Sequence, residues 1–266
     1  MNPAPIISVR DLKVHFPIRK GLLGRVRDHV RAVDGVSFDL YPGRTLAIVG
    51  ESGSGKSTTG YAVMGMEEPT SGQVLINGKD RAHMSPAERH AVTRQLQLVF
   101  QDPASALNPR MKVRHCIAEP LEIHGIGNTA SRAKRVRDLL DLVGLPESAL
   151  DRLPREFSGG QKQRIVIARA LALNPKVIIC DEAVSALDVS IQSQILNLLM
   201  DLQARLGLAY LFISHDLSVV RHISDDIAVM HRGRVVEAGP TDQLFAQTRD
   251  PYTRQLLAAV PQARPR

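Results

Sequence analysis

The chain has 266 residues, of which 44% are hydrophobic and 23% charged, a composition that excludes collagen, coiled-coil and low-complexity classes. Its 34 basic and 27 acidic residues give a net charge of +7, which by itself leaves nucleic acid, anionic lipid and nucleotide phosphates open as partners. There is no Trp and only 4% of the residues are aromatic, so little material exists for stacking nucleic-acid bases. We therefore expect no nucleic-acid partner. The length allows one large α/β domain or two modest domains.

The sequence also indicates where in the cell the chain is expected and whether its cysteines are expected to form disulfides. Its longest apolar runs, such as residues 209–213, are far shorter than the ~18 residues of a membrane-spanning helix. The first ten residues lack the basic and apolar regions of a signal peptide, so we expect a cytoplasmic chain. The two cysteines, Cys116 and Cys180, form no CxxC pair, and we expect neither a zinc site nor disulfides.

Alternating hydrophobicity over residues 6–16 and 30–40 predicts strands at an antiparallel sheet edge. We interpret the basic loop between them, within residues 19–31, as a solvated loop and assign it no role. Residues 45–49, 177–180 and 209–213 are short continuous apolar runs, which are typical of strands buried on both faces of a parallel sheet. Helical patterns separate them, so they predict an α/β core.

Residues 103–157 combine Pro-rich connections with an amphipathic run and predict an inserted helical subdomain. Residues 227–239 predict two strands joined at Arg232-Gly233. We expect Thr241 to be the N-cap of the next helix, and residues 250–261 to form one more short helix.

The segment GESGSGKST satisfies GxxxxGK[ST] between a buried strand and a helical run, the context that a phosphate-binding loop requires. Its glycines let successive N–H groups point into one concave nest, to which the helix N-terminus adds positive charge. Lys56 is expected to meet the β- and γ-phosphates of a triphosphate, and the Ser57 hydroxyl to bind Mg²⁺. The predicted nucleotide-binding residues are Gly50, Glu51, Ser52, Gly53, Ser54, Gly55, Lys56, Ser57 and Thr58.

Polar residues follow the other apolar strands. Asp181 and Glu182 end the second run, where Asp181 can hold Mg²⁺ and Glu182 can activate the attacking water. His215 follows the third run, at the sheet edge where ligands of open α/β folds gather, and can bind the γ-phosphate. Gln101 ends a further apolar stretch, and its amide can contact both the metal and the water. We predict Glu182, His215 and Gln101 as the catalytic residues.

The segment FSGGQKQR, at residues 157–164, resembles the signature motif of ATP-binding cassette (ABC) ATPases, with Phe157 where Leu is usual. The motif order also resembles that family: nucleotide loop, Gln101, SGGQ, CDE, SALD and then His215. The start of the signature helix again combines a hydroxyl, bare N–H groups and a helix dipole, and so forms a second anion site. The resemblance assigns to the ATP site of a partner cassette the residues Ser158, Gly159, Gly160 and Gln161.

The resemblance implies a P-loop NTPase (RecA-like) α/β core, an N-terminal antiparallel β subdomain and an inserted α-helical subdomain. We expect a single ABC ATPase domain at residues 6–257. Within it, the β subdomain and core would occupy about 6–101 and 162–240, and the helical subdomain about 102–161. Residues 240–266 resemble the tail of peptide importers.

The implied cofactors are ATP and Mg²⁺, the latter held by Ser57, Gln101 and Asp181. The implied partners are a second cassette, two transmembrane permease subunits and, indirectly, a solute-binding protein, at the cytoplasmic face of the inner (plasma) membrane. Asp188 resembles the residue that signals across the cassette dimer, and Phe16 is the candidate for stacking on adenine. No iron–sulfur cluster is expected, because the tail contains no cysteines.

Within the family, CDEAVSALDVSIQ and VFQDPASALNPR are similar to the ATPase subunits of oligopeptide or dipeptide importers. An ATPase of a nickel or other small-solute importer is the alternative in the same subfamily. A soluble non-transport ABC ATPase is the alternative of a different class, disfavoured because the chain has one cassette and no sustained heptads.

Overall fold

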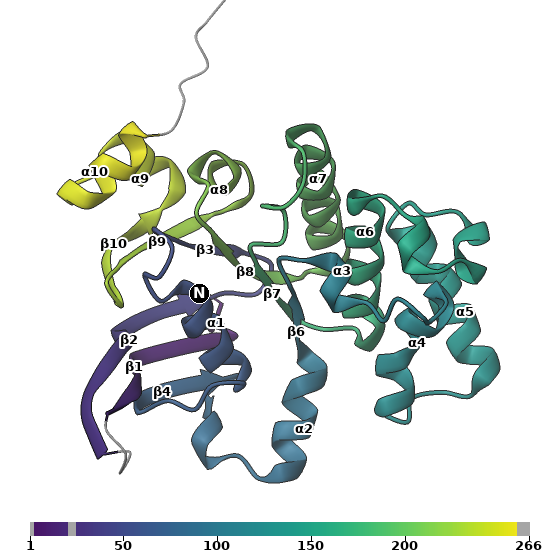
Figure 1. Ribbon diagram of the computed structural model, residues 1–266, viewed down its shortest axis with the longest axis horizontal. Coiled ribbons are helices and arrows are strands. Elements are labelled where there is room, and N and C mark those ends of the chain that lie inside the picture. The colour runs from purple at the N-terminus through teal and green to yellow at the C-terminus, as the bar shows by residue number, and fades with distance from the viewer. Residues whose placement is uncertain (1–2, 21–24, 260–266) are drawn as a thin grey trace, which may run out of the picture. The chain divides into compact units, whose positions relative to one another are not determined.

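A computed structural model describes residues 3–20 and 25–259. The chain divides into two compact units (Figure 1): unit 1 lies within residues 1–92 and 209–266, and unit 2 spans residues 93–208. The boundary at residue 92 falls within helix α2 (Pro86–Gln95). None of the described helices is long and apolar enough to cross a membrane.

Unit 1 contains an antiparallel sheet with the strand order β2-β1-β4-β5. The long strands β1 (Ile7–Lys20) and β2 (Arg25–Leu40) pair antiparallel, which confirms the predicted strands at this end of the chain. The shorter strands β4 (Ser71–Ile76) and β5 (Lys79–Asp80) complete the sheet. The loop predicted within residues 19–31 is wrong for residues 19–20, which belong to β1, and for residues 25–31, which belong to β2, because the strand pairing runs on past the alternating pattern. Residues 21–24 and the side chains of residues 19–27 lie outside the described part of the chain.

The other strands of unit 1 are ordered β10-β9-β3-β8. Strand β3 (Thr45–Val49) pairs in parallel with β8 (Ala209–Ser214) and β9 (Asp226–His231). Every residue of β3 and β8 is buried, as their continuous apolar runs predict. Strand β10 (Arg234–Pro240) pairs antiparallel with β9, which confirms the hairpin predicted at Arg232-Gly233.

The helices of unit 1 follow the predicted order with one correction. They are α1 (Lys56–Met64), α8 (Leu217–Ile223), α9 (Thr241–Ala246), α10 (Pro251–Ala258) and the 3₁₀ turn Arg81–His83. The prediction of Thr241 as an N-cap is wrong: Thr241 is already helical, and Pro240 is the cap residue. The Thr241 hydroxyl instead shares a hydrogen bond of 2.9 Å with that of Ser224, so tertiary contact outcompetes local capping.

Unit 2 contains the parallel strands β6 (Leu96–Val99) and β7 (Val177–Asp181). Its helices are α3 (Pro103–Ala106), α4 (Val113–Ile123), α5 (Thr129–Leu142), α6 (Gly159–Ala170) and α7 (Val189–Leu206). The 3₁₀ turns are Glu147–Asp151, Pro154–Glu156 and Leu171–Leu173. Residues 103–157 are therefore mainly helical, as their pattern predicts.

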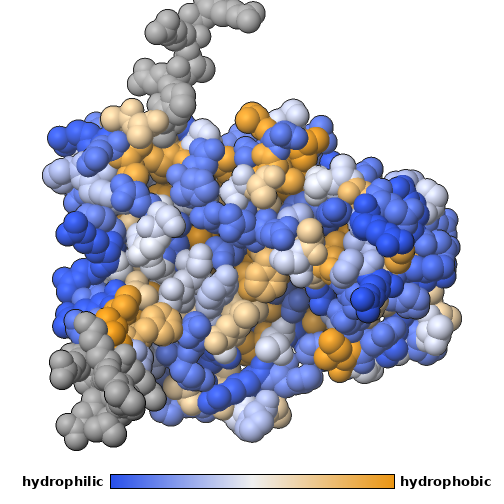
Figure 2. Space-filling view, in the orientation of Figure 1, coloured by the Kyte–Doolittle hydropathy of each residue, from blue (hydrophilic) through white to orange (hydrophobic). Residues whose placement is uncertain are grey.

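Helix α5 shows why this segment folds as it does. Its apolar residues Val136, Leu139 and Leu140 are buried on one face, while Lys134 and Arg137 on the other face are exposed. The visible surface over α5 in Figure 2 is accordingly mostly hydrophilic.

Both cysteines of the chain are buried as free thiols in unit 2. Cys116 lies on α4 and Cys180 on β7. Burial raises the pKa of Cys180 to about 12 and also raises that of Cys116, so neither forms a reactive thiolate at neutral pH.

Candidate nucleotide-binding site

The phosphate loop connects β3 to α1 in unit 1, as predicted. Its turn into the helix depends on Gly55, which caps α1 with φ of +102°. A Cβ on Gly55 would lie 2.1 Å from the Ala32 carbonyl oxygen, so no other residue fits without moving the backbone. Strand β2, which carries Ala32, thus forms one wall of the loop.

The loop encloses polar groups suited to an anion. Lys56 is only 4% exposed, and its ammonium donates hydrogen bonds of 2.8 Å to the carbonyls of Gly50 and Glu51. The Ser54 hydroxyl is buried and has no hydrogen-bond partner among the described residues. A buried cation beside an unsatisfied hydroxyl at a helix N-terminus is a favourable environment for phosphate oxygens.

His215 lies at the same edge of unit 1 as the phosphate loop. Val49 of β3 is in register with Ser214 of β8, and these strands are parallel. Gly50 and His215 therefore leave neighbouring strands in the same direction, and His215 is exposed there. The structure thus places the phosphate loop and His215, the predicted site residues of unit 1, at the same edge of the sheet.

The remaining predicted catalytic groups lie in unit 2, again at one strand edge. Val99 of β6 is in register with Cys180 of β7, so Gln101 and Glu182 follow neighbouring parallel strands. Ser185 links them: Gln101 Nε2 donates to Ser185 Oγ at 3.2 Å, and Ser185 Oγ donates to the Glu182 carbonyl at 3.0 Å.

The backbone conformation of Glu182 is unusual for a residue other than glycine. Its φ of +48° is left-handed, which costs a non-glycine residue about 1 kcal/mol or more. Strain of this kind is concentrated at functional sites because surrounding structure must enforce it. The neighbouring Asp181 ends β7 and is buried.

The signature motif begins α6 with a capping box. Ser158 Oγ accepts from the Gln161 N–H at 3.3 Å, and Gln161 Oε1 accepts from the Ser158 N–H at 3.0 Å. The two glycines pack closely against the segment that carries Asp188. A Cβ on Gly160 would lie 2.5 Å from Ile191 Cγ2, and one on Gly159 would lie 3.3 Å from Leu187 Cδ2. Asp188 itself is exposed.

The predicted Mg²⁺ ligands fit the ion in kind. Hydroxyl, amide and carboxylate oxygens from Ser57, Gln101 and Asp181 are the hard ligands that Mg²⁺ prefers. The described residues contain no group of three His, Cys, Asp or Glu side chains that forms a complete metal cage. Such a cage is not needed, because Mg²⁺ usually binds one or two protein ligands together with phosphates and water.

Phe16 lies on β1 opposite Val30 of β2, and both side chains are exposed, 38% and 52% respectively. The adenine-stacking role predicted for Phe16 stays a prediction. Sequence reasoning missed Tyr252, whose hydroxyl contacts the loop at Glu51. Residues 240–266 resemble the tail of peptide importers, but no local sequence pattern links Tyr252 to Glu51, which lies 201 positions earlier.

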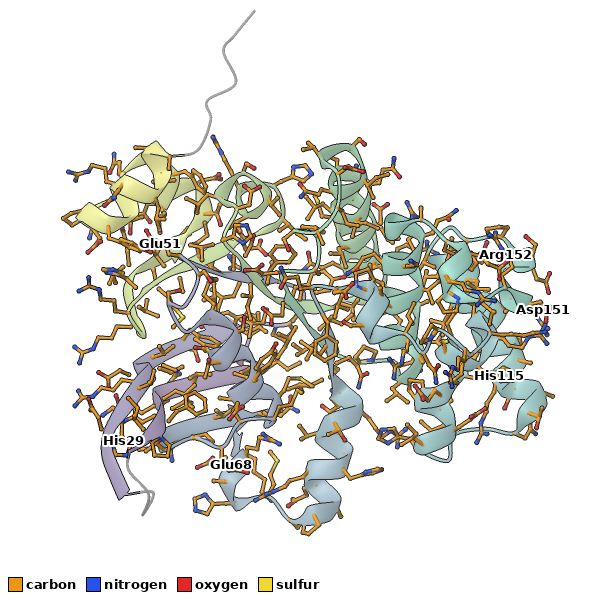
Figure 3. All side chains as sticks on the ribbon, viewed as in Figure 1. His29, Glu51, Glu68, His115, Asp151 and Arg152 are labelled. Carbon is orange, nitrogen blue, oxygen red and sulfur yellow. The ribbon has the colours of Figure 1, made fainter. Side chains whose placement is uncertain are left out.

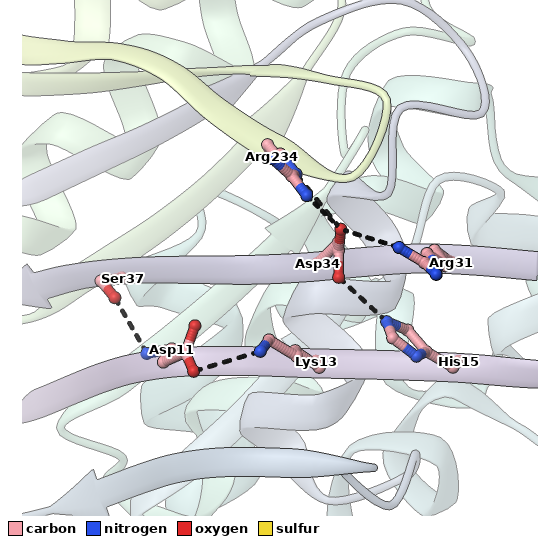
Figure 4. Close-up of polar contacts among 7 residues, drawn as sticks. All are labelled: Asp11, Lys13, His15, Arg31, Asp34, Ser37 and Arg234. Atoms are coloured by element: carbon pink, nitrogen blue, oxygen red, sulfur yellow. Dashed lines mark hydrogen bonds and ion pairs between the residues drawn. The ribbon is translucent and has the colours of Figure 1, made fainter.

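Charged side chains join β1, β2 and β10 beside the loop (Figure 4). The largely buried carboxylate of Asp34 accepts from Arg234 at 2.7 Å and from His15 at 3.2 Å, with Arg31 within 3.9 Å. The hydrogen bond from Arg234 holds the pKa of Asp34 below its ordinary value. The Asp34 N–H also donates to the Gly233 carbonyl at 2.7 Å, and the Gly233 N–H donates to the Ser54 carbonyl at 3.0 Å.

A phosphate loop between a buried parallel strand and a helix, with a polar side chain after the neighbouring strand, defines the class: an α/β P-loop nucleotide-binding domain. An ABC transporter family model matches residues 33–185, more than half of the chain, and the chain belongs to this family. The fold class expected from the sequence is confirmed.

Solved structures support the same assignment. The chain is similar to cbiO1 from Clostridium perfringens, part of the ABC transporter complex cbiONQ, with a TM-score of 0.79 and 29% identity over 91% of each chain. It is also similar to the ATP-binding cassette MJ0796 in a dimeric post-hydrolysis state bound to ADP and Pi. That TM-score is 0.75, with 28% identity over 88% of this chain and 98% of that one.

Curated relatives of high identity are named glutathione import ATP-binding protein GsiA. The protein from Escherichia coli (strain K12) is 56% identical over 262 residues, and that from Salmonella paratyphi A is 55% identical over 261 residues. Each alignment covers 98% of this chain but 42% of the relative, so the chain spans about two fifths of the length of these proteins.

Proposed function

We propose that the chain is the ATP-binding and ATP-hydrolysing cassette of an ABC importer that takes up small peptides. The observation that carries the nucleotide-binding part of the proposal is the phosphate loop. There the buried Lys56 ammonium and a buried Ser54 hydroxyl, which has no hydrogen-bond partner in the part of the chain that the structure describes, create a site for anionic oxygens. The match to the family model supports the cassette assignment. The relatives named for glutathione import favour a short peptide as cargo over nickel.

The proposed chemistry assigns one role to each group. Residues 50–58 bind the nucleotide phosphates, Glu182 accepts a proton from the attacking water, and His215 donates a hydrogen bond to the γ-phosphate. Gln101 orients the water, and its bond to Ser185 fixes the amide. Mg²⁺ would neutralise charge on the phosphates, with Ser57, Gln101 and Asp181 as its ligands.

The proposed assembly is a pair of cassettes, in which residues 158–161 of one chain complete the nucleotide site of the other and Asp188 signals between them. The solved relative MJ0796 is described as dimeric, which supports a pair. Two permease subunits and a solute-binding protein would complete the importer. We place the cassette at the cytoplasmic face of the membrane, where ATP is available.

Exchange of Glu182 for Gln tests the chemistry. Loss of a general base typically lowers a rate by about 10²–10⁴ while ground-state binding persists, so Glu182→Gln is expected to bind ATP normally and turn over slowly. Glu147→Gln is the matched control, since that carboxylate is exposed in a 3₁₀ turn of the same unit. Lys56→Ala is expected to weaken ATP binding itself. Normal turnover in Glu182→Gln, or normal ATP affinity in Lys56→Ala, would contradict the assigned roles.

Purification from native membranes tests the transport role. In this experiment, the chain is to be purified from detergent-solubilised native membranes in the presence of ATP. Proteins that co-purify with it are then to be identified by mass spectrometry. Two permease subunits and a peptide-binding protein are expected. Recovery of ribosomal or DNA-repair proteins without any membrane protein would exclude the importer and leave the ATPase chemistry standing.

A further inference from the structure

The C-terminal helix α10 contacts the phosphate loop through one side chain. The Glu51 N–H donates a hydrogen bond of 3.1 Å to Tyr252 Oη. Glu51 is the second residue of the predicted phosphate-binding segment, and it lies beside the yellow C-terminal helices in Figure 3. Burial raises the pKa of Tyr252, so the phenol is neutral at physiological pH and its oxygen is available as an acceptor.

The ring of Tyr252 is held in place from a second direction. It stacks on His231, the last residue of β9, with ring centroids 3.9 Å apart and 13° between the planes. His231 is followed by the turn Arg232-Gly233, and the Gly233 N–H donates to the Ser54 carbonyl at 3.0 Å. One hairpin therefore supports both Tyr252 and the opposite end of the loop.

The backbone that carries Tyr252 is also fixed. Asp250 caps α10, accepting from the Tyr252 N–H at 2.8 Å and the Thr253 N–H at 3.3 Å. The Glu237 carboxylate on β10 accepts from the Thr248 hydroxyl and from the N–H groups of the next two residues, at 2.8–3.2 Å. The Tyr252 hydroxyl is thus presented to the loop by an ordered segment, at little further cost in entropy.

We propose that Tyr252 is a positioning residue of the nucleotide site. Its hydroxyl engages the Glu51 N–H on the outside of the loop and so fixes the curl that directs the following N–H groups at phosphates. The C-terminal segment thereby sets nucleotide affinity without touching the nucleotide. This inference rests on the proposed binding of nucleotide by residues 50–58.

Tyr252→Phe tests the inference, because it deletes one oxygen and keeps the ring and its stack on His231. ADP affinity is measured by titration with a fluorescent ADP analogue, and turnover at saturating ATP. We expect ADP binding to weaken about three- to tenfold, the range of one net hydrogen bond, with turnover at saturation within about twofold of wild type. Tyr41→Phe is the matched control, since Tyr41 lies in the turn before β3 and outside the site.

Hydrogen exchange gives a second, local readout. The Glu51 amide is expected to be protected in the wild-type chain and to exchange faster in Tyr252→Phe, with Tyr41→Phe unchanged. A wild-type chain that does not bind ADP would overturn the proposed function. A wild-type chain that binds ADP, together with a Tyr252→Phe variant of equal affinity and equal Glu51 exchange, would overturn only the role of Tyr252.

Discussion

The two predicted phosphate-binding elements of the chain are held in different ways. The phosphate loop in unit 1 is supported from distant parts of the sequence, by Ala32, Gly233 and Tyr252. The signature motif in unit 2 is built mainly by its own residues, through the capping box between Ser158 and Gln161. Its two glycines pack closely against Leu187 and Ile191, about thirty positions later.

This difference has a physical basis. A helix N-terminus needs only a side chain within three residues to satisfy its free N–H groups, so a short motif suffices to form it. The phosphate loop has six residues, 50–55, between strand and helix. Its helix has no side-chain cap, because Gly55 occupies the cap position. Its curl must therefore be enforced from outside, and remote substitutions are expected to affect it.

The largest expected effect is that of Gly233→Ala. Gly233 has φ of +81°, and a Cβ there would lie 2.8 Å from the Arg31 carbonyl oxygen. The substitution is expected to lower the free energy of unfolding by about 2 kcal/mol and to weaken ADP binding, because the Gly233 N–H then pulls away from Ser54. Urea unfolding and ADP titration measure the two effects.

Gly78→Ala is the control for Gly233→Ala. Gly78 has nearly the same φ, +78°, in the same unit, but its added Cβ would meet nothing within 4 Å. It therefore isolates the backbone strain from the steric contact. Equal ADP affinity in both variants would show that the β9–β10 turn does not support the loop.

The same contrast explains how much of the molecule could be predicted from sequence. The buried strands and the positions of Gln101, Glu182 and His215 follow from local signals, because an apolar run and the polar residue after it fix where a strand ends. The amphipathic pattern likewise identifies α5. The contacts of Glu51 with Tyr252 and of Ser54 with Gly233 could not be predicted, since each joins residues about 180–200 positions apart with no shared local pattern.

Thr241 illustrates the limit at short range. Its residue type and position favour an N-cap, yet its hydroxyl hydrogen-bonds Ser224, so the helix begins one residue earlier than expected. Local rules state which hydrogen bonds a side chain can make. Tertiary packing decides which of them it makes.

A smaller effect is expected for Ser158→Ala, which removes the capping oxygen of α6. Loss of an N-cap costs about 1 kcal/mol, and the free energy of unfolding is expected to fall by that amount. ADP affinity of the isolated chain is expected to stay unchanged, since the loop in unit 1 determines it. Ser158→Asn is expected to restore stability, because Asn caps as well as Ser. A loss of ADP affinity in Ser158→Ala would contradict the view that the signature motif and the phosphate loop are supported independently.

The smallest expected effect depends on pH and concerns Asp34. The hydrogen bond from Arg234 lowers the pKa of Asp34 in the folded chain, so ionised Asp34 stabilises the fold at pH values above its unfolded pKa. That contribution is lost as the pH falls through the lower, folded pKa. Asp34→Asn is therefore expected to lower the melting temperature at pH 7 and to lower it less, or not at all, at pH 3.

Asp11→Asn serves as the control, because Asp11 lies on the same sheet with a side chain that is 69% exposed and a single ion pair to Lys13 at 3.4 Å. Ion pairs of that kind contribute little, so its melting temperature is expected to follow the wild type at both pH values. A gap between Asp34→Asn and wild type that is equal at pH 7 and pH 3 would mean that the carboxylate charge is not what joins β1, β2 and β10. The support of the loop by this turn would then rest on the backbone bonds of Gly233 alone.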